Sequence, residues 1–282
     1  EHAKSHDTRV WAMRTKRDKQ AHAIDEWEEL RDLASQIKTH TLTNLDTYLE
    51  QFEANAKANG VHVHWAADGA EQNRIIHDIF KDHGVKRVIK AKSMLMEECG
   101  FRHYMDGVGI EIVETDLGER IQQLDGEDPS HIVVPPVHKM RSDVASLFAE
   151  KLGSDPDNDD AHYLAGAKRD ATRPLILDAD AGMTGANFAV AETGGFVVCT
   201  NEGNADLSAN VPNLHVASIG IEKLVPRVED MGVFIRLLSR SALGSPITQY
   251  TSHFRAPRAG TEMHMVLVDN GRSERLGMEE FW

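Results

Sequence analysis

The stretch VHVHWAADGAEQNRIIHDIFKDHGVKRVI, residues 61–89, places one helical segment between two short apolar segments. Residues 61–65 and 85–89 have the pattern of buried strands, and residues 70–83 have that of a helix. A strand, a helix and a second strand in this order predict parallel strands joined by a right-handed crossover. The stretch therefore indicates an α/β fold.

The same alternation continues along the chain. We expect helices at 94–99, 117–124, 141–152, 162–177 and 228–243, and strands at 108–114, 131–134, 188–192, 196–200, 214–219, 247–251 and 264–268. Thr193-Gly194-Gly195 predicts a hairpin turn, and the acidic segment 153–160 is expected to be a surface insertion. The fold class is α/β, a parallel-rich sheet with flanking helices.

An N-terminal helical arm is expected to precede this sheet. One apolar face is formed by Ile24, Trp27, Leu30, Leu33, Ala34 and Ile37. A second helix should start near Thr43 or Asn44, carry Tyr48 and Phe52, and end at Gly60. We expect Trp27, Leu30 and Tyr48 to be largely buried against the sheet domain.

Composition excludes several classes of function. The 282 residues carry a net charge of −14, which argues against a nucleic-acid partner bound through its phosphates. No apolar run approaches the ~20 residues of a membrane span. Two distant cysteines cannot supply the four thiolates of an iron–sulfur cluster, and they fit a reducing cytoplasm. His62 and His64 point to one face of a strand, as a metal pair would, but the sequence places no third ligand beside them, so we expect no metal.

Polar residues follow the strands where ligands bind in α/β proteins, at the carboxyl ends. These residues are Lys90, Lys92 and Ser93, then Asp116 and Glu119, His138, Asn201, Glu202, Gly203 and Asn204, and finally Glu222 and Lys223. Lys92 and Ser93 precede a helix, which is typical of an anion site, although Ser93 as a simple cap with solvated lysines is the alternative. His138 is positioned as a general base.

A glycine-rich loop joins this set. It comprises Gly182, Thr184, Gly185 and Asn187, and centring the hairpin on Gly194 pairs Asn187 with Asn201. We therefore expect Asn201, Glu202 and Asn204 to line a cleft that faces Thr184, Asn187 and His138. Gly203 permits a positive φ there. Burial would raise the pKa of Glu202 and suit it to proton transfer or covalent capture, whereas Lys223 would lower it.

These segments also resemble a known family. The stretches IKAKSMLMEE, VETDLGERIQQL, PSHIVVPPVHK, DADAGMTGANFAVAETGGFVVCTNEGN, IGIEKLVP, LLSRSALGSPITQYTSHF and VLVDNGR, between Trp11 and Arg272, look like the lactate-utilisation protein B family and its LUD domain. The resemblance implies a fold similar to NagB, ribose-5-phosphate isomerase (RpiA) and coenzyme A transferase. Pro136 departs from the alanine that the family more often has before the His-Lys pair, which would tighten the loop holding His138.

The resemblance also implies a function. Family members continue into a ferredoxin-like region with two [4Fe–4S] clusters, so we expect an arm at 1–59, a LUD domain at 60–272 and the start of a linker at 273–282, with no cofactor in this chain. The implied role is cytoplasmic oxidation of L-lactate to pyruvate with two partner proteins, in which the domain binds a small anionic ligand or docks. A free-standing coenzyme A transferase- or sugar-phosphate isomerase-like enzyme, and a scaffold with a vestigial pocket, are the alternatives.

Overall fold

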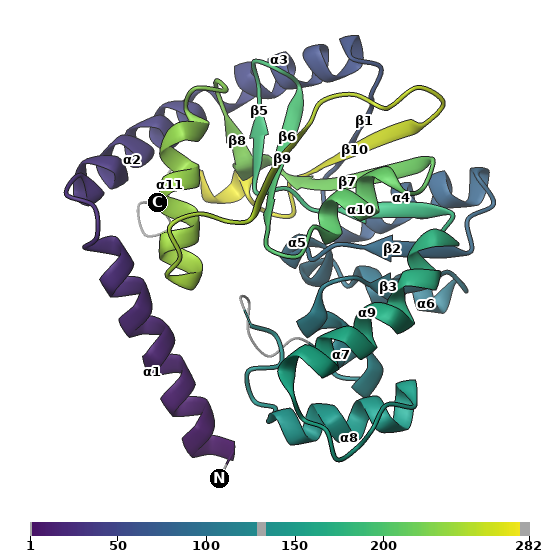
Figure 1. Cartoon of the computed structure of the whole chain (residues 1–282). Coiled ribbons are helices and arrows are strands. Elements are labelled where there is room, and N and C mark those ends of the chain that lie inside the picture. The colour runs from purple at the N-terminus through teal and green to yellow at the C-terminus, as the bar shows by residue number, and fades with distance from the viewer. Residues whose placement is uncertain (1, 129–133, 277–282) are drawn as a thin grey trace.

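Two β-sheets form the centre of the molecule in a computed structural model that describes residues 2–128 and 134–276, without the side chains of residues 2–6. Six strands make a fully parallel sheet in the order β1-β10-β7-β4-β2-β3. Four strands make a second sheet in the order β8-β5-β6-β9. The predicted α/β class is confirmed, with helices flanking a parallel sheet (Figure 1).

The elements alternate along the chain much as the sequence predicts. The strands are β1 (His62–Ala66), β2 (Arg87–Lys90), β3 (Glu111–Glu114), β4 (Ala181–Thr184), β5 (Phe188–Val190), β6 (Gly195–Thr200), β7 (Leu214–Gly220), β8 (Leu224–Val225), β9 (Tyr250–Phe254) and β10 (Glu262–Val268). The helices are α1 (His2–Ala21), α2 (Trp27–Thr43), α3 (Leu45–Ala58), α4 (Gly69–Asp82), α5 (Met94–Glu98), α6 (Phe101–Gly107), α7 (Leu117–Asp125), α8 (Arg141–Leu152), α9 (Ala161–Leu177), α10 (Asn204–Asn210) and α11 (Met231–Leu243).

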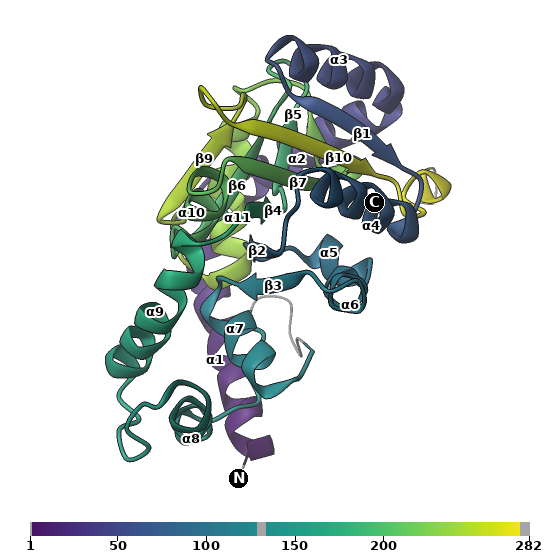
Figure 2. The same ribbon diagram turned by 90° about the vertical axis from the view of Figure 1, so that its right-hand side faces the viewer.

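Both faces of the parallel sheet are buried. Successive side chains of a strand point to opposite sides, so each strand contributes to two apolar clusters. On β10, Val266 packs with α4, α5 and α6, whereas Met265 packs with α3 and the second sheet. Figure 2 shows α4, α5 and α6 on one side of the sheet and β6, β9 and α10 on the other. A third apolar cluster joins α7, α8 and α9.

The N-terminal helices differ in how closely they pack. Phe52 and Ala56 of α3 are fully buried in the core of the parallel sheet, and Leu30 of α2 is buried, but Trp27 and Tyr48 are only half-buried. Leu33, which the pattern places on the apolar face, is 43% exposed. The family-domain boundary at residue 60 stays a prediction.

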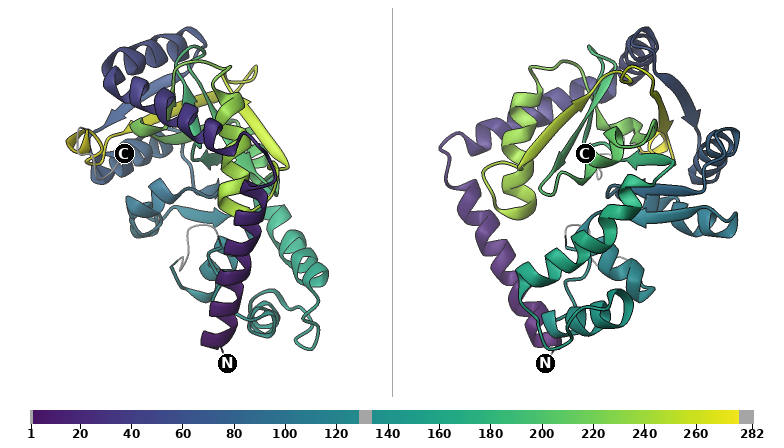
Figure 3. Two further views of the ribbon diagram at one scale, coloured as in Figure 1. Left: turned by 90° about the vertical axis from the view of Figure 1, so that its left-hand side faces the viewer. Right: turned by 45° about the vertical axis from the view of Figure 1, so that its right-hand side comes forward.

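Helix α1 extends away from α2 and packs along α11 (Figure 3). The Arg9 side chain donates a hydrogen bond to the carbonyl oxygen of Lys139 at 2.8 Å. The α1 helix thus connects α11 to the segment that precedes α8.

Several expectations about individual elements are wrong. The glycine-rich segment begins as β4, a buried central strand, so only residues 185–187 form a loop. The hairpin and the predicted strand at 247–251, which is β9 at Tyr250–Phe254, belong to the second sheet. Residues 108–110, where a strand is expected to begin, form the turn after α6, and β3 begins at Glu111. The strand expected at 131–134 falls mainly outside the described residues.

The hairpin register also differs from the expected pairing. Val190 pairs with Gly195 and Phe188 with Val197, so Asn187 lies near Val198 and not opposite Asn201. Asn201 follows the last residue of β6 and therefore lies beyond Asn187, its expected partner.

Gly182 should be required for the packing of α10 on β4. A Cβ at this position would lie 1.7 Å from the carbonyl oxygen of Ser208 in α10, so the helix would have to move. We expect Gly182→Ala to lower the free energy of unfolding by about 1–3 kcal/mol in urea denaturation.

Gly166 in α9 is the matched control because a Cβ added there would meet no neighbouring heavy atom within 4 Å. Gly166→Ala should raise the stability by up to about 1 kcal/mol, as alanine favours helix more than glycine. Equal effects of the two substitutions would contradict the packing argument.

Candidate functional site

A cavity of about 680 Å³ opens at the carboxyl ends of the parallel strands, between the two sheets and α11. Ten of the residues predicted for the site line it: Lys92, Ser93, Asp116, Gly185, Asn187, Asn201, Glu202, Asn204, Glu222 and Lys223. Leu238, Ala242 and Leu243 of α11 add an apolar wall. The structure therefore brings strand ends that are distant in sequence to one pocket.

Lys92 and Ser93 lie in the connection from β2 to α5. Ser93 caps this helix by accepting a hydrogen bond from the Met96 N–H at 3.4 Å, which is the simple capping role considered above. Gly185 lies against Ser93, since a Cβ on Gly185 would come within 2.8 Å of the Ser93 Oγ. Helix α5 has only five residues, so its dipole adds little to an anion site.

Glu202 is held on one side of the cavity by the start of α7. Its carboxylate accepts a hydrogen bond from the Leu117 N–H at 3.2 Å, and its Oε2 lies 4.0 Å from the Lys168 Nζ. Partial burial raises the pKa of Glu202, with Asp116 adding to the shift and Lys168 opposing it. Lys168, in place of the expected Lys223, therefore opposes the rise in the pKa of Glu202.

Three asparagines lie beside Glu202, and part of each amide is used structurally. The Asn187 Oδ1 accepts a hydrogen bond from the Cys199 N–H at 2.8 Å, and the Asn201 Oδ1 accepts one from the Gln249 N–H at 3.1 Å. Asn204 Nδ2 donates to the Thr115 Oγ1 at 3.4 Å. These bonds fix the amides where they line the cavity.

Arg272 and Glu98 complete the cavity and are not among the predicted site residues. Arg272 Nε donates to the Glu222 Oε2 at 2.5 Å, and its Nη2 donates to the Glu98 Oε2 at 3.0 Å. The hydrogen bond from Arg272 lowers the pKa of Glu98. Lys223 Nζ lies 3.3 Å from the other oxygen of Glu222. Arg272 follows β10, so the rule that polar residues after a strand end form the site could have found it.

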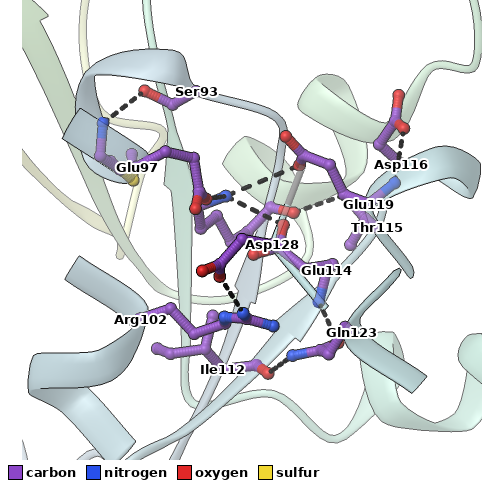
Figure 4. Close-up of polar contacts among 12 residues, drawn as sticks. Ser93, Glu97, Arg102, Ile112, Glu114, Thr115, Asp116, Glu119, Gln123 and Asp128 are labelled. Carbon is purple, nitrogen blue, oxygen red and sulfur yellow. Dashed lines mark hydrogen bonds and ion pairs between the residues drawn. The ribbon is translucent and has the colours of Figure 1, made fainter. Parts of the chain in front are cut away.

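Behind the cavity lies a buried ion cluster centred on Lys90. Lys90 Nζ is 2.9 Å from Glu114, 3.1 Å from Glu97 and 3.6 Å from Glu119, and its side chain is fully buried. The three glutamates come from β3, α5 and α7 and converge as Figure 4 shows. Burial alone would lower the pKa of Lys90, but the three carboxylates raise it on balance.

Six predicted residues do not line the cavity, and one of them is Lys90 of the buried cluster. His138 pairs instead with Glu127 at 3.0 Å, contrary to the expectation that it faces Glu202. Glu119 belongs to the buried cluster, and Thr184, on β4, contacts the His215 ring at 2.9 Å. Gly182 packs under α10, and Gly203 caps α10 with a φ of 68°, as its glycine allows.

Sequence comparison with known proteins identifies the family of the chain. The LUD domain family matches residues 49–275, and the chain belongs to this family. It is 42% identical over 270 residues to lactate utilization protein B from Bacillus cereus strain B4264 and from Bacillus thuringiensis strain Al Hakam, and to lactate utilization protein B 2 from Bacillus mycoides strain KBAB4. These matches cover 94% of this chain but 57% of each relative, so the chain spans little more than half of their length.

A solved structure is also similar. A DUF162 family protein from Deinococcus radiodurans aligns with a TM-score of 0.41 and 13% identity over 79% of this chain and 98% of that protein. Within residues 2–128 and 134–276, no helix combines the length and apolar character needed to cross a membrane.

Glu119 should make the stability of the domain depend on pH. Burial raises its pKa from 4.5 to about 8, with Glu114 and Asp116 adding to the effect and Lys90 opposing it. The folded state therefore binds this proton more tightly than the unfolded state does. The free energy of unfolding should fall as the pH rises from about 4.5 to about 8.

Glu119→Gln should flatten this dependence and add about 1 kcal/mol or more at pH 8, measured by urea denaturation across the pH range. Glu150→Gln, on the exposed face of α8, is the control and should leave the profile unchanged. A Glu119→Gln profile parallel to that of the unmodified chain would mean that Glu119 is ionised in the folded state.

Proposed function

We propose that this chain is the LUD domain of a lactate-utilisation iron–sulfur protein and that its cavity binds a small carboxylate during the oxidation of lactate to pyruvate. The observation that carries the proposal is that Lys92 and three asparagine amides line one cavity together with Lys223 and Arg272, the two cations that hold Glu222. Guanidinium, ammonium and amide groups are the donors that hold carboxylates in proteins. The names of the similar proteins supply the pathway.

The chain's own Glu222 supports a carboxylate as the ligand. Its two oxygens lie against Lys223 and Arg272, so this pair of cations already coordinates one carboxylate. A second anion in the cavity would be drawn to Lys92 and to the amides, which line the same cavity. The apolar side chains of α11 would exclude water from the non-ionised part of a small hydroxy or keto acid.

Glu202 favours an alternative in which the domain itself performs chemistry. A carboxyl group with a raised pKa that lines a cavity is suited to proton transfer or to nucleophilic attack on a thioester. This role corresponds to the coenzyme A transferase-like alternative, and the hydrogen bond from Leu117 would orient the carboxylate for it. Turnover of an acyl-coenzyme A by the isolated chain would favour this alternative.

The iron–sulfur part of the proposal does not involve this chain's cysteines. Cys99 caps α5 and Cys199 lies on β6, and two thiols do not fit a four-thiolate cluster. In the proposed protein, two [4Fe–4S] clusters would be held by a ferredoxin-like region of the kind that the family resemblance implies. The two other lactate-utilisation proteins are the proposed partners.

Lys92→Ala should weaken carboxylate binding without unfolding the domain. We expect the dissociation constant for pyruvate or L-lactate to rise by about 5- to 150-fold, since a hydrogen bond to a charged group contributes about 1–3 kcal/mol. Isothermal titration calorimetry on the chain measures this change.

Lys86→Ala removes the same charge from the opposite end of β2 and is the matched control. Equal weakening by both substitutions would assign the effect to net charge. Unchanged affinity in Lys92→Ala would leave Ser93 and Lys92 with only the role of beginning α5.

Glu202→Gln should separate chemistry from packing because it keeps the shape and an oxygen that accepts the Leu117 N–H. We expect the variant of the complete gene to produce folded protein but to fail in supporting growth on lactate. The control is Glu192→Gln, at the opposite end of the hairpin, where the side chain accepts a hydrogen bond from Val228. Normal growth of both variants would reduce Glu202 to a structural residue.

A further inference from the structure

A second cluster of polar side chains lies at the amino ends of the parallel strands, opposite the carboxyl ends that form the cavity. His62 begins β1 and Glu262 begins β10, with His264 two residues further along β10 on the same face. The seven residues of β10 place this cluster about 20 Å from the carboxyl-end cavity. It is therefore separate from the proposed carboxylate site.

The side chains of this cluster point toward one carboxylate. His264 Nε2 lies 2.7 Å from the Glu262 Oε1, and His62 Nε2 lies 3.6 Å from the same oxygen. One ligand atom from each of the three residues lies within 4.8 Å of the others. Ligands around a tetrahedral zinc ion are separated by about 3.4 Å, because zinc binds imidazole nitrogen and carboxylate oxygen at about 2.0–2.2 Å. The His264–Glu262 pair is closer than that and must open slightly, so small rotations of the Glu262 and His62 side chains, both of which border solvent, would bring the three atoms to that spacing.

Two further histidines support this arrangement from behind. His83 Nδ1 donates to the Ile79 carbonyl oxygen at 2.7 Å, and in the imidazolium form, in which both ring nitrogens carry protons, its Nε2 donates to the Glu262 Oε2 at 3.2 Å. His64 Nε2 lies 2.9 Å from the Nδ1 of His264. Protein metal ligands commonly have such a partner on the second ring nitrogen, which fixes the orientation of the ring.

The backbone holds His62 and His264 together independently of their side chains. They are paired directly in the parallel register of β1 with β10, and their rings stack with centroids 4.8 Å apart. His264 is buried, whereas His62 and Glu262 border a second cavity of about 530 Å³ through which an ion can enter. A buried histidine, an exposed histidine and a carboxylate on one solvent-accessible cavity are the elements of an open zinc site.

We propose that His62, His264 and Glu262 bind a divalent transition-metal cation of the zinc class. His64 and His83 are positioning residues that orient His264 and Glu262. Imidazole and carboxylate ligands favour zinc and its neighbours over magnesium or calcium, which prefer oxygen alone. The ion joins the edge strand β1 to β10, so its first effect is to stabilise that edge of the sheet.

The test is metal binding by the chain after treatment with a chelator. We expect one equivalent of Zn²⁺ by isothermal titration calorimetry, a rise in Tm on adding Zn²⁺, and a visible ligand-field absorption when Co²⁺ replaces it. His62→Ala and Glu262→Gln should each weaken Zn²⁺ binding at least tenfold and abolish the Co²⁺ absorption. Both positions are on the protein surface, so the variants should fold.

His103→Ala is the matched control. His103 is also exposed, and its Nε2 lies 3.4 Å from an Asp128 carboxylate oxygen, but it has no second histidine in reach among the described residues. It should leave the affinity unchanged. Binding that is absent, that survives both site variants, or that falls equally in all three variants would overturn the proposal.

Discussion

The buried Lys90 at the end of β2 is the interaction on which the carboxyl-end cavity depends. It draws together Glu97 of α5, Glu114 of β3 and Glu119 of α7. An unpaired lysine would not remain buried there, because an isolated charge in the interior costs several kcal/mol. The connections that leave these strands carry Lys92 and Asp116, so the cluster fixes where both side chains reach the cavity. Three carboxylates for one ammonium leave an excess of negative charge, and the raised pKa of Glu119 relieves it by retaining a proton.

The second constraint is steric and concerns the wall formed by the second sheet. The turn of the hairpin lies against α3, where a Cβ on Gly194 would come within 2.1 Å of the Ala56 nitrogen. Asn55 Nδ2 donates to the carbonyl oxygens of Ala191 and Glu192 at 2.9 and 3.1 Å. Docking at this end sets the direction of β6, whose other end carries Asn201 and Glu202 into the cavity. An N-terminal helix thus helps to position the site although it contributes no residue to it.

The sequence predicts this architecture well where the pattern is local. Helix α8 begins and ends at the predicted residues, and the strand–helix–strand unit that opens the sheet is found with small shifts. The positions of Asn201 and Glu202 at a strand end follow from the same reasoning. Expectations that depended on pairing between distant segments were less accurate. His138 follows a segment outside the described residues and pairs with Glu127, and no local pattern shows that Ala181–Thr184 is a central strand and not a loop.

The histidine cluster shows the same limit at the other edge of the sheet. The alternation of His62 and His64 identifies one face of a strand, but their partners follow some two hundred residues later. Glu262 and His264 become neighbours of His62 and His64 only because β10 lies between β1 and β7 in the sheet. Parallel pairing then brings like ends of strands together, so each edge of the sheet collects the side chains that begin or end its strands. At the carboxyl ends these are cations, amides and carboxylates, and at the amino ends they are imidazoles around Glu262. The strand order, which no single segment specifies, therefore determines both sites.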